Sequence, residues 1–242
     1  MDRVTSPVNH AAARSDTIKI DGRPARLLII DDHELLGQSL AVALTAEGVE
    51  CRVTAGPTRQ DVVDAATSQA PDLVLLDLDL GQALGSGLDL IPALREATGN
   101  VVMLTGTNDR IRHAECVESG AQGVLVKSLP FDGLLTAIRR ALTNGTLLTS
   151  AEREDLLALL RQHRSAAHAR LAPFEALTPR ERDVLAALMD GKSAEDIANE
   201  WVVAMSTVRS QIRGVLGKLG VGSQLSAVAL ARRSGWDQGQ AR

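Results

Sequence analysis

Five polar residues whose side chains suit phosphoryl chemistry each follow a short apolar stretch of the chain. They are Asp31, Asp32, Asp77, Thr105 and Lys127. The apolar stretches that precede them are Leu27–Ile30, Leu73–Leu76, Val101–Leu104 and Val124–Val126. Carboxylates of this kind can hold a divalent cation, while a hydroxyl and an ammonium can bind the oxygens of a phosphoryl group.

The apolar stretches indicate how these side chains are positioned. Runs this short, bounded by turn residues, are typical of buried parallel strands. In an open α/β sheet, ligands bind beyond the carboxyl ends of the strands. A single Asp after one strand is usually a helix cap or a solvated loop residue. Polar residues at several strand ends instead predict one shared site.

Residues 25–145 alternate apolar strands with amphipathic helices. This alternation predicts a doubly wound, five-stranded parallel sheet of the flavodoxin-like α/β class. The expected strand order is 2-1-3-4-5, which makes strands one and three neighbours at about 4.8 Å. We therefore expect Asp32 and Asp77 to face each other. Pro92 is compatible with the third helix only in its first turn.

Crowded carboxylates repel, and the pKa of each rises unless a cation lies between them. Mg²⁺ fits this requirement, because it takes one or two carboxylates, keeps several waters and recruits phosphate oxygens. Asp77 could then attack a phosphoryl group and hold it as an aspartyl phosphate. Thr105 and Lys127 could bind the phosphoryl oxygens.

Four segments within residues 26–143 closely resemble the receiver domain of two-component response regulators. They read "LLIIDD", "PDLVLLDLDL", "VVMLTGT" and "GAQGVLVKSLP". The resemblance implies that Asp77 is the phosphoacceptor and that Thr105 and Lys127 contact the phosphoryl group. It also implies Mg²⁺ ligation by the side chains of Asp32 and Asp77, by the backbone carbonyl of Asp79, and by Asp31 mostly through water.

Two residues depart from the receiver pattern. The position after Gly123 is often a rotating Tyr or Phe, but here it is Val124. The Pro usual four residues after the phosphoacceptor is Gly81. Val124 keeps a second interpretation open, in which an atypical receiver serves as a protein-docking module and DNA binding does not depend on phosphorylation.

From Thr178 onward the pattern is that of short capped helices. Thr178 with Glu181, and Ser193 with Asp196, have the spacing of capping boxes. Ser206 is expected to cap a third helix that ends at Leu219, and a fourth covers residues 224–234. Two short helices joined by a tight turn predict a helix-turn-helix.

Charge distinguishes this region, because Trp201–Gly235 contains no Asp or Glu. Its basic residues are Arg209, Arg213, Lys218, Arg232 and Arg233. A one-signed surface is typical of a phosphate-backbone partner, although a solvated basic face is the simpler alternative. In the third helix, Val208, Ile212, Val215 and Leu219 have helical spacing and should pack inward. Arg209, Ser210 and Arg213 lie on another face, suited to the major groove, and Lys218 is a further expected DNA contact.

The stretch "LTPRERDVLAALMDGKSAEDIANEWVVAMSTVRSQIRGVLGKLGVGSQ" strongly resembles the LuxR-type helix-turn-helix of the NarL/FixJ class. The resemblance covers about residues 174–236. It implies that the third helix is the recognition helix and that the fourth makes a dimer interface. Gln211, Gly214 and Gly217 depart from the usual residues.

The 242 residues allow about two domains of roughly 100–150 residues. The expected segments are a disordered extension (1–24), a receiver (25–145), a helical linker (146–172) and a DNA-binding domain (173–242). A net charge of −4 provides no overall basic field. No apolar run reaches the roughly 20 residues of a membrane span, and no signal core is present, so we expect a cytoplasmic protein.

These observations predict a response regulator transcription factor, not an enzyme. The implied partners are Mg²⁺, double-stranded DNA, a sensor histidine kinase, RNA polymerase and a second copy of the chain. The rival interpretation is a nucleotide- or flavin-binding enzyme. The Gly81–Gly87 loop lacks the Lys-Ser/Thr ending of a P-loop, and the scarcity of aromatics disfavours flavin.

Overall fold

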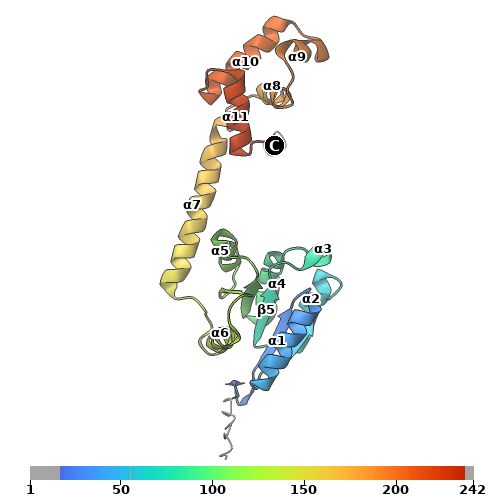
Figure 1. The fold of residues 1–242 in the computed structure, drawn as a ribbon, viewed down its shortest axis with the longest axis vertical. Helices are drawn as coiled ribbons and strands as arrows, with labels where there is room; N and C mark the ends of the chain where they lie inside the picture. Colours follow the sequence, from blue (N-terminus) through green and yellow to red (C-terminus); the bar gives the residue numbers. More distant parts are fainter. Residues whose placement is uncertain (1–16, 55, 238–242) are drawn as a thin grey trace, which may run out of the picture. The chain divides into compact units, whose positions relative to one another are not determined.

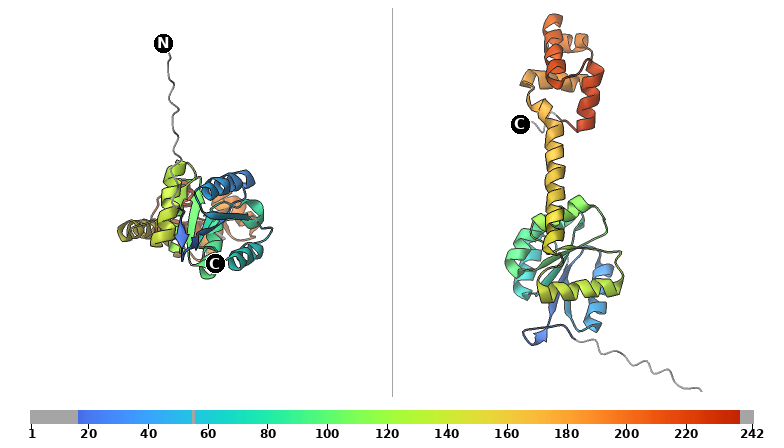
Figure 2. Two further views of the ribbon diagram at one scale, coloured as in Figure 1. Left: turned by 90° about the horizontal axis from the view of Figure 1, so that it is seen from below. Right: turned by 90° about the vertical axis from the view of Figure 1, so that its left-hand side faces the viewer.

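The computed structural model describes residues 17–54 and 56–237. The chain forms two compact units that divide between Leu160 and Arg161. This division lies within helix α7 (Ser150–Glu175), which the right-hand view of Figure 2 shows as one continuous helix. Helix α7 continues past the expected linker end at residue 172 and includes Pro173.

The first unit contains a five-stranded parallel sheet in the order β4-β3-β5-β6-β7. Its strands are β3 (Arg26–Ile30), β4 (Glu50–Thr54), β5 (Leu73–Asp77), β6 (Val101–Thr105) and β7 (Val124–Val126). This order confirms the expected 2-1-3-4-5 arrangement. Nearly every residue of β3, β5 and β6 is buried, as continuous apolar strands between two helical layers should be.

Helices cover both faces of this sheet (Figure 1). Side chains of α1 (Glu34–Ala46) and α6 (Phe131–Asn144) contribute to the core on one face. The other face is covered by α2 (Arg59–Gln69), α4 (Ile91–Thr98) and α5 (Arg110–Glu118). Pro92 lies in the first turn of α4, where the sequence required it.

The loop after β5 is more structured than the sequence predicted. It contains the short helix α3 (Gly81–Leu84) and a 3-10 turn, η1 (Gly87–Leu90). A side chain at Gly87 would collide with the backbone carbonyl of Asp77, so only glycine fits there. The loop is therefore held tightly against the end of the strand that carries Asp77.

The assignment of the whole segment 1–24 to a disordered extension is wrong for its last part. Strands β1 (Lys19–Ile20) and β2 (Arg23–Pro24) form an antiparallel hairpin. Asp21 and Gly22 have φ values of 51° and 79°, as a two-residue hairpin turn of this kind requires. The Arg23 guanidinium donates two 2.7 Å hydrogen bonds to Asp72. Residues 1–16 lie outside the described residues.

The second unit is all-helical: α8 (Pro179–Met189), α9 (Ala194–Glu200), α10 (Met205–Leu219) and α11 (Gln224–Ser234). Both expected capping boxes are confirmed, at Thr178 and at Ser193. The expected cap at Ser206 is wrong, because α10 begins earlier and its N-cap is Ala204, which has no capping side chain. The inward-facing residues of α10 are buried as expected, namely Val208, Ile212, Val215 and Leu219.

Within the described ranges, no single helix is long and apolar enough to cross a membrane. The bent pair of α10 and α11 passes a test of length and composition alone. Its apolar side chains, such as Val208 and Val215, belong to the core of the helical unit.

Candidate functional sites

Asp31, Asp32 and Asp77 converge at the carboxyl ends of β3 and β5. Strands β3 and β5 pair in parallel with Ile30 opposite Leu76, so the next residues, Asp31 and Asp77, are neighbours. Asp31 is thus the register neighbour of Asp77, while carboxylate atoms of Asp32 and Asp77 also lie within 4.8 Å of each other, as expected from the sequence. Asp31 and Asp77 are buried, at 1 % and 4 % exposure, whereas Asp32 is exposed.

Lys127 connects the two buried carboxylates. Its Nζ donates a 2.7 Å hydrogen bond to Asp77 Oδ2 and a 2.9 Å bond to Asp31 Oδ2. The chain reaches this point because Lys127 follows β7, and its backbone N–H donates to the Thr105 carbonyl at the end of β6. One ammonium thus forms hydrogen bonds with both buried carboxylates.

The pKa directions follow from this arrangement. Burial raises the pKa of Asp77 above its ordinary value, and the neighbouring charge of Asp31 adds to the rise, although Lys127 opposes it. Burial alone would lower the pKa of Lys127, but its hydrogen bonds to Asp77 and Asp31 outweigh burial and raise it. Lys127 is therefore firmly charged, while burial disfavours the charged form of Asp77.

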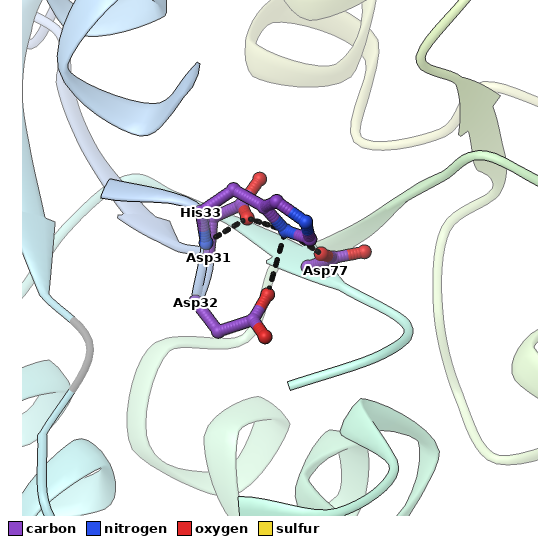
Figure 3. Close-up of side chains that lie close together, drawn as sticks. All are labelled: Asp31, Asp32, His33 and Asp77. Carbon is purple, nitrogen blue, oxygen red and sulfur yellow. Dashed lines mark hydrogen bonds and ion pairs between the residues drawn. The ribbon is translucent and has the colours of Figure 1, made fainter. Parts of the chain in front are cut away.

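His33 is a member of this cluster that the sequence analysis missed. Its Nδ1 lies 2.8 Å from Asp32 Oδ1, 3.3 Å from Asp31 Oδ1 and 4.0 Å from Asp77 Oδ2 (Figure 3). It directly follows the acidic pair, and that adjacency was the available signal. The donor atoms of Asp31, Asp32, His33 and Asp77 all lie within 4.8 Å of one another.

This donor set fits Mg²⁺, which prefers oxygen ligands and one or two carboxylates in an open site. Asp31, Asp32 and Asp77 supply carboxylate oxygens, and two of them are held by the protein before any ion arrives. The N–H of His33 donates to Asp31 Oδ1, and the N–H of Asp79 lies 3.4 Å from Asp77 Oδ1. The carboxylates are thus oriented by backbone groups.

A cavity of about 430 Å³ opens beside Asp77. The residues that line it are His33, Leu36, Asp77, Leu78, Asp79, Thr105, Gly106, Thr107, Arg112 and Lys127. Thr105, Lys127 and Asp79 therefore share one cavity with Asp77. The Thr105 hydroxyl accepts a 3.2 Å hydrogen bond from the Thr107 N–H. Arg112 was not predicted, since its place depends on how α5 packs.

A second candidate site lies on α10 of the helical unit. Arg209, Ser210 and Arg213 are all exposed, on the side of the helix away from its buried residues. Among the described residues, none forms an ion pair with Arg209 or Arg213. Both guanidinium groups are thus available to a phosphate or to a base edge.

Lys218 has a different environment from these arginines. Its Nζ donates a 2.6 Å hydrogen bond to Oε2 of the buried Glu181, which also accepts from the N–H and the hydroxyl of Thr178. Gly214 lies against Glu181 so closely that a side chain there would overlap the Glu181 carboxylate. Gly214 of α10 therefore makes room for the hydrogen bonds of Glu181.

Comparison with known proteins identifies two domain families in the chain. Residues 27–139 match the response regulator receiver domain family, and residues 175–231 match the bacterial regulatory proteins of the luxR family. NarP, a nitrate/nitrite response regulator protein of Escherichia coli, is 31 % identical over 213 residues, or 87 % of this chain and 95 % of NarP.

Two other relatives extend this likeness over most of the chain. NarL, the nitrate/nitrite response regulator protein of Escherichia coli, is 29 % identical over 84 % of this chain and 93 % of its own length. The transcriptional regulatory protein DesR of Bacillus subtilis is 27 % identical over 87 % of this chain and 98 % of DesR. The chain belongs to the NarL/FixJ family of response regulators, with a receiver domain and a LuxR-type DNA-binding domain.

Proposed function

We propose that phosphorylation of Asp77 controls sequence-specific DNA binding by α10. The observation that carries this proposal is the buried Asp77 carboxylate, which shares Lys127 with Asp31 and opens onto a cavity that Thr105 also lines. An aspartate in this setting is a nucleophile with a cation already beside it. A sensor histidine kinase would be the natural phosphoryl donor.

In the reaction, a carboxylate oxygen of Asp77 bonds to phosphorus as the bond from phosphorus to the donor breaks. Lys127, which now bridges Asp77 and Asp31, would pair with the phosphoryl oxygens, and the Thr105 hydroxyl would donate to another. Asp31, Asp32 and Asp77, with the carbonyl of Asp79, would hold Mg²⁺. When bound, this ion neutralises the carboxylates and the phosphoryl oxygens.

On DNA, Arg209, Ser210 and Arg213 would face the major groove. Arginine reads guanine through two parallel hydrogen bonds, so these residues would supply sequence preference as well as affinity. Lys218, expected from the sequence as a further contact, is not part of this proposal, because its ammonium is paired with Glu181. A homodimer through α11, where Leu225 is 80 % exposed, would bind paired half-sites and act with RNA polymerase in the cytoplasm.

The decisive experiment sequences the DNA retained by the full-length protein with and without a small phosphodonor and Mg²⁺. We expect labelling of Asp77 to require Mg²⁺ and to be abolished by a chelator. We also expect the labelled protein to retain a defined set of DNA sites. Equal enrichment of the same DNA sites with and without labelling would favour the alternative, a docking receiver with phosphorylation-independent DNA binding. The motive for this alternative is Val124, which stands where receivers often have an aromatic residue.

A further inference from the structure

Arg112 stands out among the charged residues that line the Asp77 cavity. It lies in the first turns of α5, and its side chain is exposed while it borders the same cavity as Asp77, Thr105 and Lys127. Lys127 is matched by two carboxylates, and His33 lies against Asp32. Among the described residues, none forms an ion pair or hydrogen bond with Arg112.

The charges around the cavity make this arginine informative. Asp77 and Asp79 line the cavity, and Asp31 and Asp32 lie beside it, so an approaching phosphoryl dianion meets several carboxylates. The ammonium of Lys127 is already engaged. Arg112 offers a planar guanidinium with free donors, the group best suited to hold a phosphoryl group through two hydrogen bonds.

We propose that Arg112 captures the phosphoryl group of the incoming donor at the mouth of the cavity and orients it toward Asp77. This inference rests on the proposed phosphorylation of Asp77. Arg112 is a substrate-binding residue in this scheme, since it acts before bond formation. Its ligand is the phosphoryl dianion itself, whether it is carried by an acyl phosphate or by a phosphorus–nitrogen donor such as phosphohistidine.

For an acyl phosphate the step balances without any further reactant. A carboxylate oxygen of Asp77 forms a bond to phosphorus, the bond from phosphorus to the acyl oxygen breaks, and the leaving carboxylate takes the electron pair. No proton is transferred. For a phosphorus–nitrogen donor, the leaving nitrogen takes up a proton from solvent.

The test compares full-length wild type with R112A, R112K and R110A in saturating Mg²⁺. Arg110 is the matched control, because it is exposed two residues earlier on α5 but does not line the cavity. The measurements are the rate of Asp77 labelling by acetyl phosphate and by phosphoramidate, both below saturation, and the decay of the label after the donor is removed.

We expect R112A to be labelled about five- to tenfold more slowly with both donors, which corresponds to the loss of one typical hydrogen bond. R112K should lie in between, and R110A should stay within about twofold of wild type. The R112A defect should shrink as salt is added, and decay of the label should be unchanged, since hydrolysis involves no donor to capture.

Several results would overturn the inference. R112A could be labelled as fast as wild type, or R110A could be slowed as much as R112A, which would indicate a general charge effect. A defect seen with acetyl phosphate alone would show that Arg112 binds the acyl part. If wild type were not labelled at all, the proposed function itself would fail, and this inference with it.

Discussion

At the residue scale, the most informative feature is the sharing of one ammonium by Asp31 and Asp77. Because the pKa of Asp77 is raised in the folded protein, its ionised form at neutral pH favours the unfolded chain. The contribution of this group to stability should therefore grow as pH falls through the raised pKa. Replacing Asp77 with a neutral isostere should remove the cost.

We expect Asp77→Asn to abolish labelling by a small phosphodonor while the metal-free variant melts at a temperature no lower than wild type. Lys127 keeps its hydrogen bond to Asp31 in this variant, so the site does not lose its cation. Mass spectrometry and a thermal melt at neutral pH measure the two effects. A phosphoryl adduct on the variant would show that another residue accepts the phosphoryl group.

The exposed arginines of α10 should act on DNA and not on folding. We expect Arg209→Ala or Arg213→Ala to weaken binding to a selected site by about 1–3 kcal/mol if the side chain reads guanine. If the side chain contacts only phosphate, binding should weaken equally on all sequences. The slope of log affinity against log salt concentration should then become shallower by about one. Titrations at several salt concentrations separate the two cases.

Arg233→Ala is a control for these variants, because Arg233 is an exposed cation on α11 whose Nε donates to the Ala229 carbonyl of its own helix. It should leave the sequence preference unchanged. Unaltered affinity of both α10 variants would contradict the assignment of α10 as the recognition helix.

At the scale of elements, the turn between α9 and α10 carries backbone strain. Val202 has φ = 54°, in the left-handed region, and its side chain is 90 % exposed. A left-handed residue with a Cβ costs about 1–2 kcal/mol, more than the extra chain entropy that glycine loses on folding, about 0.5–1 kcal/mol. We expect Val202→Gly to stabilise the helical unit by about 0.5–1 kcal/mol.

Fluorescence-detected urea unfolding measures this change, because both tryptophans, Trp201 and Trp236, lie in the helical unit. An unfolding midpoint at a lower urea concentration for Val202→Gly than for wild type would show that the exposed valine makes a stabilising contact.

The second element-scale feature is the buried network that joins α8 to α10. Burial alone would raise the pKa of Glu181, but its hydrogen bonds with Lys218 and Thr178 outweigh burial and lower it. A depressed pKa means that ionised Glu181 stabilises the folded unit above its unfolded pKa of about 4.5, and that this stabilisation is lost as pH falls through the folded pKa.

We expect Glu181→Gln to destabilise the helical unit by about 1–2 kcal/mol at neutral pH, because the charge-assisted bond to Lys218 is lost. The variant should also lose less stability than wild type when the pH is lowered below about 4.5. Urea unfolding across this pH range tests both effects. Parallel pH profiles for the two proteins would contradict this role of Glu181.

At the scale of the whole molecule, the question is how strongly the receiver state controls dimerisation. Val124 is half-buried and packs against the core on the face covered by α2, α4 and α5. Its β-branched side chain is stiff and too small to fill the same space in two states. A receiver switches only as far as the phosphoryl group favours one conformer.

We expect a phosphoryl mimic to tighten the dimer only a few-fold, since a complete switch from 1:99 to 99:1 needs about 5.5 kcal/mol. Analytical ultracentrifugation with and without the mimic measures the change. Val124→Tyr should enlarge the response if an aromatic ring at this position is what couples the two states. Tightening of about a hundredfold in the wild type would contradict the prediction.

Local patterns in the sequence determined much of this structure. Apolar runs marked the strands, and the common order of doubly wound sheets predicted their arrangement. The pairs Thr178/Glu181 and Ser193/Asp196 marked two helix starts, because capping depends on residues three apart. The hairpin at Asp21-Gly22 was equally readable, since this dipeptide between alternating apolar residues is a strong hairpin signal. We missed this hairpin because the longer segment that precedes it, residues 1–17, is largely polar.

Only the tertiary structure decided which side chains meet. Strand register, which is set by packing across the sheet, makes Asp31 the strand-end neighbour of Asp77. The packing of α8 against α10 brings Lys218 within hydrogen-bond distance of Glu181, and the packing of α5 brings Arg112 to the cavity beside Asp77. A sequence pattern specifies periodicity within an element. The distances between elements depend on contacts between residues far apart in the chain, which no local pattern contains.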